Sequence, residues 1–228
     1  MPRKPLAAPA TGYSNAEDTR RRLIKAGLAV FSAHGYDGVT TRLLADQAHV
    51  NQSAIPYHFG GKEGVYLAVA DAICDDLAAR LTPLLSRAMA HRDPAEALPD
   101  LLAALYRLSH TEAADRERFT LILFEQQHPS AAFERFHSRL LQPLLDTLAR
   151  LVGTLRDLPA DAEATRLQAH MLLGLVSSLI SRRASFERQF GSDQQLAPAI
   201  RVRVEAELRQ MATEFVLGMR GPAPRHRA

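Results

Sequence analysis

The chain has 228 residues, 46% of them hydrophobic, and its formal net charge is +3 at pH 7. This length allows one large domain or two small ones, and the apolar content is ample for a buried core. The single cysteine, Cys74, excludes an internal disulfide framework and fits a reducing cytoplasm.

The N-terminal residues and the apolar runs of the sequence indicate where the protein resides in the cell. No long apolar run follows Arg3 and Lys4, as a signal peptide would require. The longest apolar stretch, residues 171–180, is far shorter than a membrane span. The sequence therefore predicts a soluble cytoplasmic protein with no membrane partner. Residues 1–62 hold eight Lys and Arg against four Asp and Glu, so the positive charge is concentrated in the N-terminal part.

The first predicted elements are a tail and a helix. Residues 1–13 are rich in proline and alanine, which predicts a disordered basic tail. Ser14 and Glu17 have the spacing of a capping box, and this predicts a helix that begins at Ser14 and runs to about His34. Gly35 then ends that helix, because glycine readily adopts the left-handed conformation of a helix C-terminus.

A helix, a tight turn and a second short helix follow. Thr40 can cap a helix that runs to Ala48, and Asn51 can cap a second one from Gln52 to about His58. This order of elements is what places one helix in the DNA major groove. The sequence therefore predicts a helix-turn-helix DNA-binding domain over 14–62.

The second short helix has an inward face, formed by Ile55 and Phe59, and an outward polar face that suits DNA. Glutamine can read adenine, serine and alanine tolerate close approach to bases, and tyrosine and histidine can reach phosphate. Gly60–Gly61 allows a sharp turn. Lys62 then begins the next helix, where its charge opposes the helix dipole and suits a phosphate contact. The outward residues are Gln52, Ser53, Ala54, Tyr57 and His58.

The stretch from Thr19 to Tyr66 resembles the DNA-binding domain of TetR-type transcriptional regulators. The matching residues are Ile24, Ala26, Phe31, Gly35, Val39-Thr40-Thr41-Arg42, Ala45, Ala48, Val50 and Ile55-x-Tyr57-His58-Phe59-x-x-Lys62-Glu63. The resemblance implies phosphate contacts from Thr41, Tyr57, His58 and Lys62, and base contacts from Arg42, Gln52, Ser53 and Ala54. Pro56 departs from the family pattern, and because proline lacks an N–H, we expect it to shorten or kink the second helix.

The rest of the chain is predicted to be helical throughout. Apolar periodicity indicates a connecting helix over 63–90 with a kink at Pro83, and a boundary at 91–96, where Asp93 caps and Pro94 begins the next helix. The fold class is therefore all-α. Further helices are predicted over 94–110, 112–127, 130–157, 161–190 and 193–219.

The resemblance also implies a role for the C-terminal body. It makes residues 91–220 a helical ligand-binding and dimerisation domain, followed by a disordered tail over 221–228. The segment Phe124–Pro129, followed by Phe133 and Phe136, resembles the body of the CecR subgroup of the family. Candidate ligand-pocket residues combine aromatic and polar side chains on core-facing stripes: Phe119, Leu123, His128, Phe133, Phe136, His137 and His170.

Dimerisation is expected because one short helix reads too few bases to find a site in a genome. Small and apolar residues on the last two long helices would form a four-helix bundle between two subunits. The candidates are Leu167, Met171, Gly174 and Ser178 on the first, and Leu208, Met211, Phe215 and Met219 on the second.

Three alternatives remain open at this point. The 40–63 segment can be an ordinary helical hairpin with a polar surface, or the protein can be an architectural DNA binder without sequence preference. The third is a di-iron enzyme, because Glu125-x-x-His128 and Glu134-x-x-His137 have the ligand spacing of such bundles. The copies lie too close in sequence for that site. The prediction is therefore a non-enzymatic, ligand-responsive repressor that binds a palindromic DNA operator as a homodimer, without cofactor or metal.

Overall fold

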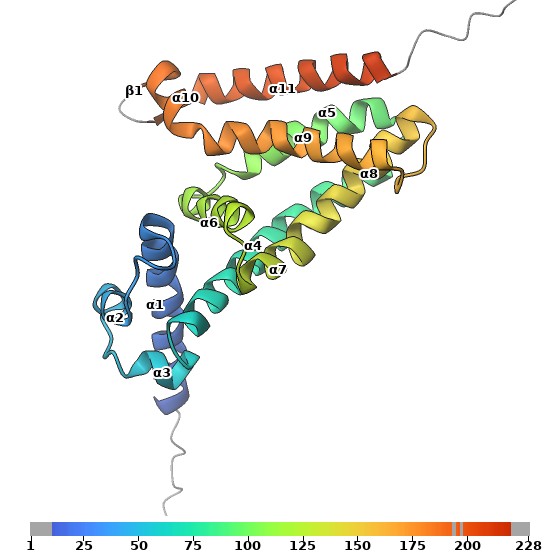
Figure 1. Cartoon of the computed structure of the whole chain (residues 1–228). Helices are drawn as coiled ribbons and strands as arrows, with labels where there is room; N and C mark the ends of the chain where they lie inside the picture. The colour runs from blue at the N-terminus through green and yellow to red at the C-terminus, as the bar shows by residue number, and fades with distance from the viewer. Residues whose placement is uncertain (1–10, 193–194, 197, 220–228) are drawn as a thin grey trace, which may run out of the picture. The chain divides into compact units, whose positions relative to one another are not determined.

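The computed structural model describes residues 11–192, 195–196 and 198–219. By their internal contacts the residues divide into two compact units, Met1–Ile73 and Cys74–Ala228, and the division falls inside one long helix, α4 (Lys62–Ala90). Figure 1 shows helices in both units, so the predicted all-α class is confirmed. The exception in the described residues is an antiparallel pair of two-residue strands, β1 (Gly191–Ser192) and β2 (Gln195–Leu196).

The first unit, which we call the head, is a small helical cluster. It contains α1 (Thr11–His34), α2 (Thr41–Ala48), α3 (Ala54–Phe59) and the first turns of α4. Its core is apolar, because each helix packs one stripe of apolar side chains inward. The side chains with no exposed surface there are Leu23, Phe31, Leu44, Ile55 and Val65.

The predicted start of the first helix is wrong. α1 already includes Thr11–Tyr13, so Ser14 lies inside the helix instead of capping it, and residues 11–13 do not belong to a disordered tail. The last proline before this segment is Pro9, and Gly12 weakens a helix without breaking it, so the helix can begin at Thr11. The remainder of the predicted tail, residues 1–10, lies outside the described residues. The predicted end is confirmed, since Gly35 has a φ of 68° and its N–H bonds to the Phe31 carbonyl at 2.9 Å.

The second unit, the body, is built around α5 (Pro94–Leu108). This helix contacts α8 (Gln142–Arg156), α9 (Glu163–Ser181) and α11 (Pro198–Met219), and Leu98 and Leu102 on it have no exposed surface. Asp93 caps it as predicted, with Oδ1 accepting from the Ala95 N–H at 2.8 Å. The body helices after α4 are α5 (Pro94–Leu108), α6 (Asp115–Gln127), α7 (Ala131–Phe136), α8 (Gln142–Arg156), α9 (Glu163–Ser181), α10 (Arg183–Phe190) and α11 (Pro198–Met219).

Several predicted body boundaries differ from the structure. The helix predicted over 130–157 is continuous but contains a π-helical turn, η1 (His137–Leu141), between α7 and α8. Pro143 follows that turn and has no N–H to donate to the carbonyl four residues back. The backbone hydrogen bonds therefore shift locally from the α-helical spacing of four residues to the π-helical spacing of five. The helix predicted over 161–190 is interrupted at Arg182, where no glycine or proline marks a break.

Two other helices begin later than predicted. α6 begins at Asp115 instead of residue 112, and α11 begins at Pro198 instead of residue 193. Residues 193–194, the predicted start of α11, lie outside the described residues, as does the tail predicted over 221–228. α4 continues through Pro83 and ends at Ala90, where the connecting helix was predicted to end.

Candidate functional site

The predicted helix-turn-helix begins with a capped helix. The Thr40 hydroxyl oxygen accepts a hydrogen bond from the Leu43 N–H at 3.1 Å, as predicted. Leu44 and Ala48, one turn apart, are both buried in the core of the head. These contacts leave Arg42 on the opposite, solvent-facing side, where it makes a long ion pair of 3.8 Å with Asp46.

The turn between α2 and α3 is held by polar side chains. His49 adopts a left-handed conformation with φ 53° and ends α2. Asn51 Oδ1 accepts from both the Ser53 N–H at 2.9 Å and the Ser53 hydroxyl at 2.8 Å. Gln52 Nε2 donates to the Thr41 hydroxyl at 2.9 Å, so the first residue of α2 and the turn before α3 are tied together.

α3 begins two residues later than predicted, at Ala54, because the Asn51–Ser53 turn occupies the positions before it. Ile55 has no exposed surface, whereas Tyr57 is 83% exposed. Pro56 is the third residue of α3, where a backbone N–H has no partner within a helix. It therefore costs the helix no hydrogen bond, and the next N–H, that of Tyr57, bonds to the Ser53 carbonyl at 3.3 Å.

Arg20 and Arg22 of α1 have a structural role that no local sequence pattern indicates. Arg20 donates to the His58 carbonyl at 3.3 Å, and its guanidinium lies 4.6 Å from the centre of the Phe59 ring. Arg22 donates to the His49 carbonyl. Both arginines therefore bind carbonyls at the C-terminal ends of α2 and α3, where helices lack internal donors.

Lys62 is bound within the head instead of standing free. Its Nζ donates to the Tyr36 carbonyl at 3.0 Å and lies 4.1 Å from the centre of the Tyr36 ring. Burial, and then the charges of Glu63 and Asp37, raise the pKa of the Tyr36 hydroxyl. The lysine is half-buried. These contacts offset the unfavourable position of a cation at a helix N-terminus.

The turn between α3 and α4 depends on glycine. Gly60 and Gly61 have φ values of 75° and 147°, which other residues rarely adopt. Gly64 has a different constraint, since a Cβ there would lie 1.7 Å from the Phe59 carbonyl oxygen. This close approach fixes α3 against the start of α4, and no motif in the sequence marks it.

The eight residues predicted to contact DNA lie on α2, on α3, in the turn between these helices and at the start of α4. Arg42, Gln52, Ser53 and Tyr57 are exposed, and the other members are half-buried. His58 lies edge-on to Tyr57, with ring centroids 4.8 Å apart. Since Ile55 points inward, this surface, which we call the reading face, is formed by polar side chains around the N-terminus of a short helix.

The predicted pocket residues do not form one site in the body. Phe119 and Leu123 line an apolar cavity of about 70 Å³, which we call the inner cavity, together with leucines of α4, α5 and α8. His137 and His170 instead line a separate polar hollow of about 480 Å³ between α8 and α9. This division was not visible in the sequence because the residues share similar apolar stripes.

The remaining three pocket candidates have other surroundings. His128 is exposed and stacks on Phe124 with ring centroids 4.8 Å apart. Phe133 is half-buried beside His137, at 5.5 Å between ring centroids. Phe136 is buried in the core of the body with 1% exposed surface. None of the three lines the inner cavity.

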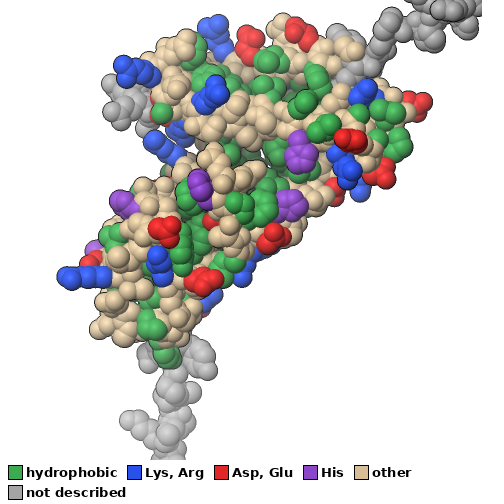
Figure 2. All heavy atoms as spheres, in the orientation of Figure 1, with side chains coloured by type: hydrophobic (Ala, Val, Ile, Leu, Met, Phe, Trp, Pro, Cys, Tyr) green, Lys and Arg blue, Asp and Glu red, His purple; other side chains and the backbone are tan. Residues whose placement is uncertain are grey.

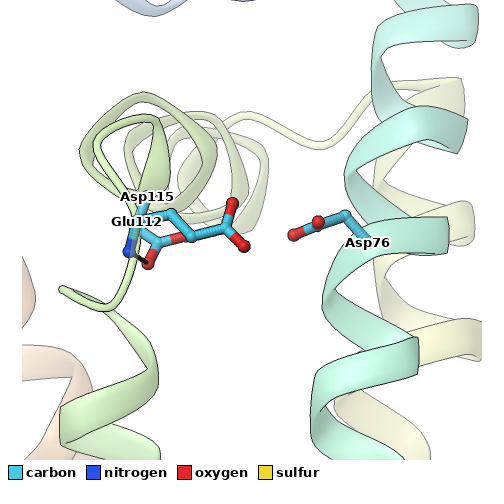
Figure 3. A group of neighbouring side chains, drawn as sticks. All are labelled: Asp76, Glu112 and Asp115. Carbon is cyan, nitrogen blue, oxygen red and sulfur yellow. Dashed lines mark hydrogen bonds between the residues drawn. The ribbon is translucent and has the colours of Figure 1, made fainter.

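The Glu-x-x-His segments do not assemble a metal site in the described part of the chain. Glu125 is buried and accepts hydrogen bonds from the N–H and the hydroxyl of Ser130, at 2.9 and 2.8 Å. Among the described residues, one group of side chains that can bind metals does lie close together, namely the carboxylates of Asp76, Glu112 and Asp115. Figure 3 shows Glu112 and Asp115, from the start of α6 and the loop before it, facing Asp76 on α4.

Two arginines form ion pairs with these carboxylates. Arg80 makes a bidentate pair with the fully buried Asp115, at 2.8 and 2.9 Å. Arg118 pairs with Asp115 at 3.0 Å and with Glu112 at 2.6 Å. Because the two arginines already pair with all three carboxylates, Asp76 included, we interpret this network as a tie between α4 and α6 and not as a metal centre.

The buried network makes stability depend on pH. Burial alone raises the pKa of Asp115, but hydrogen bonds from Arg80, the Glu112 N–H and Arg118 outweigh it and hold the pKa below its ordinary value of 3.8. A carboxyl with a lowered folded pKa contributes stability above its unfolded value, and this contribution is lost as the pH falls through the folded value.

We therefore expect the urea midpoint of the native chain to fall steeply as the pH drops below 3.8, the ordinary pKa of this carboxyl. In the Asp115→Asn variant this carboxyl is absent, so the urea midpoint should fall less over the same pH range. Midpoints measured by circular dichroism from about pH 6 downward test this. Parallel profiles for the two proteins would show that Asp115 does not titrate in this range.

The predicted dimer residues occupy two environments. On α9, Leu167, Met171 and Gly174 are exposed and Ser178 is half-buried. On α11, Met211 is exposed and Phe215 half-buried, but Leu208 is 2% exposed and packs inside its own subunit. The side chain of Met219 lies outside the described residues. Figure 2 shows hydrophobic side chains scattered among charged ones over α9 and α11.

No helix in the described part of the chain combines the length and the apolar character needed to cross a membrane.

Comparisons with known proteins agree with this architecture. Residues 23–69 match the model of the bacterial regulatory proteins of the tetR family. Residues 78–218 match the C-terminal domain of the HTH-type transcriptional dual regulator CecR. The chain therefore belongs to the TetR family of bacterial transcriptional regulators and has a CecR-type C-terminal domain, as the sequence resemblance indicated.

Individual relatives support the same classification. The HTH-type transcriptional dual regulator CecR of Shigella flexneri is 32% identical, over 69% of this chain and 74% of that protein. The HTH-type transcriptional repressor AcnR of Corynebacterium diphtheriae is also 32% identical, over 74% of this chain and 85% of that protein. Among solved structures, AibR in complex with isovaleryl coenzyme A and operator DNA has the same fold, with a TM-score of 0.60 at 15% identity, covering 86% of this chain and 97% of that one.

Proposed function

We propose that this regulator is a repressor that binds a palindromic operator as a homodimer and is released by a small molecule. The observation that carries the proposal is the reading face, a solvent-exposed polar surface at the N-terminus of a short helix on a packed head. The name of AcnR, a repressor, favours repression, and that of CecR, a dual regulator, is compatible with it.

Within the reading face we assign different tasks to different residues. Arg42, Gln52, Ser53 and Ala54 would face base edges, and Thr41, Tyr57, His58 and Lys62 would contact phosphates. The exposure of Tyr57 supports this division, because an 83% exposed aromatic side chain on this surface is accessible to a phosphate. The hydrogen bond from Gln52 to Thr41 would orient both side chains before DNA binds.

We propose dimerisation through the exposed apolar side chains of α9 and α11. Leu167, Met171 and Met211 are 52%, 66% and 50% exposed, so their apolar surface is available to a second subunit, which would bury it. A Cβ added at Gly174 would meet no atom within 4 Å, so a partner helix has room to approach there. Leu208 is excluded from this surface because it is buried in its own subunit.

The ligand would act through the body. A molecule in or beside the inner cavity would contact α4, α6 and α9 side chains at once. Such a molecule shifts the regulator from its DNA-binding state only by binding another state more tightly. Accordingly, we assign residues 14–62 to DNA binding, 63–90 to the connection and 91–220 to ligand binding and dimerisation, in a cytoplasmic protein that meets chromosomal DNA directly.

The operator is needed before these assignments can be tested. Sequencing the DNA fragments that the purified protein selects from a random pool should return a palindrome whose half-sites lie about one helical turn apart. A selected pool without dyad symmetry would contradict the proposed dimer, and a pool without any preference would favour the architectural alternative.

Arg42→Ala should relax the base preference at one position of each half-site and cost about 1–3 kcal/mol of binding free energy. Lys62→Met should weaken binding to all sequences and lower the slope of log K against log salt by about 0.9 per subunit. The salt slope separates a phosphate contact from the structural role of Lys62 toward Tyr36, because loss of a purely structural contact leaves the slope unchanged.

Arg156→Ala provides a control for net charge. This arginine ends α8 in the body, and its substitution removes the same charge without touching the head. It should leave both the base preference and the salt slope as they are. An equal slope change in Arg156→Ala and Lys62→Met would show that the effect of Lys62 reflects overall charge and not a phosphate contact.

A further inference from the structure

A second cavity adjoins the inner cavity of the body. It has a volume of about 270 Å³ and is lined by residues of α6, α9, α10 and the turn after α5. Phe119, Leu123 and Ile180 line both spaces, so the two are separated only by shared side chains. We call this second cavity the mouth. Each space is small, and together they reach the lower end of the range of typical ligand pockets, which begins at about 300 Å³.

The two spaces differ in chemistry. The inner cavity is lined mainly by leucine, isoleucine, valine and phenylalanine side chains. The mouth is lined by His110, Arg116 and Arg183, and no Asp or Glu is among its lining residues in the described part of the chain. A molecule that fills both would therefore meet positive charge at one end and apolar surface at the other.

The charge of the mouth is only partly neutralised by the protein. Arg116 is exposed and makes no ion pair with any described residue. Arg183 Nε donates to the buried Glu187 at 2.5 Å, so this carboxylate offsets one of the two positive charges. The other arginine remains available, and guanidinium groups suit carboxylate and phosphate oxygens in geometry as well as in charge.

His110 adds a neutral polar group to the same wall. Burial lowers the pKa of its imidazole, and the charges of Arg183 and Arg201 lower it further. Its Nδ1 lies 3.0 Å from the Ser109 hydroxyl. The Ser109 hydroxyl donates to the Tyr106 carbonyl at 2.8 Å, so both side chains are held within the protein and line the wall without adding a charge that must be buried.

We propose that the effector of this regulator is an organic anion with a short apolar tail, bound with its anionic group at Arg116 and Arg183 and its tail in the inner cavity. This inference rests on the proposed ligand-responsive function and adds the chemical class of the ligand. The size of the inner cavity restricts the tail to a few carbon atoms or one ring. Cationic amphiphiles are excluded, because the arginines repel them.

The test uses the full-length protein and three probes of equal length: hexanoate, hexan-1-ol and hexylamine. Calorimetry should detect saturable binding of hexanoate and much weaker binding of the alcohol and the amine. Arg116→Gln and Arg183→Gln should each weaken hexanoate binding by about tenfold or more, because each removes a charge-assisted hydrogen-bond donor. Arg188→Gln, an exposed arginine of α10 that does not line the mouth, should leave the affinity unchanged.

Arg183→Gln breaks the pair with Glu187 and can impair folding. The Arg116→Gln variant still decides the test in that case, because Arg116 is exposed and has no ion-pair partner among the described residues. Equal affinity for the acid and the alcohol, unchanged hexanoate affinity in Arg116→Gln, or no binding of hexanoate would each overturn the assignment. Substitution of phosphate monoesters for hexanoate shows which anionic group is preferred.

Failure of the ligand class and failure of the proposed regulation give different results. DNA binding is measured in parallel on the selected operator. If DNA is bound specifically but no acid binds, the regulator stands and the inference about its ligand fails. If hexanoate binds at the mouth but the operator affinity does not change at saturation, the site stands and ligand-responsive release through it fails.

Discussion

Asp115→Asn should lower the free energy of unfolding by about 3–5 kcal/mol, the usual cost of removing one partner from a buried ion pair. Asp115 has no exposed surface and accepts hydrogen bonds from Arg80, Arg118 and the Glu112 N–H. An asparagine presents one oxygen where the aspartate presents two, and its NH₂ group faces a guanidinium. Both arginines would then remain in a poorly hydrated site with less compensating charge. Urea unfolding followed by circular dichroism at a fixed subunit concentration measures the loss.

Asp75→Asn is the matched control on α4. Its side chain is 72% exposed and pairs with Arg139 at the surface, where an ion pair contributes about 0–1 kcal/mol. We expect little change in its urea midpoint. A comparable loss in both variants would mean that burial does not distinguish the two carboxylates, and the network would then have no special role in joining α4 to α6.

The double variant Leu167→Glu/Met171→Glu should be monomeric and should bind the operator roughly 10³-fold more weakly than the native protein, at the level of non-specific binding. In a two-fold symmetric interface each residue meets the same surface of the other subunit, so four carboxylates would be brought together in a poorly hydrated contact. A single head then reads one half-site only. Sedimentation gives the oligomeric state, and titration of the selected operator gives the affinity.

Met89→Glu controls for the added charge and the lost methionine. Met89 is 43% exposed near the end of α4 and lies outside the proposed dimer surface. This variant should remain dimeric with native operator affinity. A dimeric Leu167→Glu/Met171→Glu protein would contradict the placement of the interface on α9, whatever its DNA affinity.

Local signals in the sequence predicted the secondary structure well where a single residue type satisfies a local requirement. Thr40 and Asp93 cap helices as predicted, because their side-chain oxygens bond to N–H groups two or three residues away. Gly35 ends α1 because it adopts a positive φ. The predicted start at Ser14 failed, since the same capping pattern also occurs inside a helix when nothing upstream breaks it.

The candidate site was less predictable, because its geometry depends on contacts between residues distant in sequence. The stripes that carry Phe119 and His170 look alike in sequence, yet one lines an apolar cavity and the other a polar hollow. The pairing of Arg80 with Asp115 spans 35 positions and leaves no local pattern. The same holds for Arg20, which bonds to a carbonyl 38 positions away.

The separation of tasks in the head has a practical consequence. Ile55, Gly64 and the carbonyls bound by Arg20 and Arg22 hold α3 in place, whereas the side chains of Arg42 and Tyr57 point into solvent. A library randomised at the outward positions alone would therefore keep a folded scaffold. Selection from such a library offers a route to biosensors with new target promoters but the original chemical input.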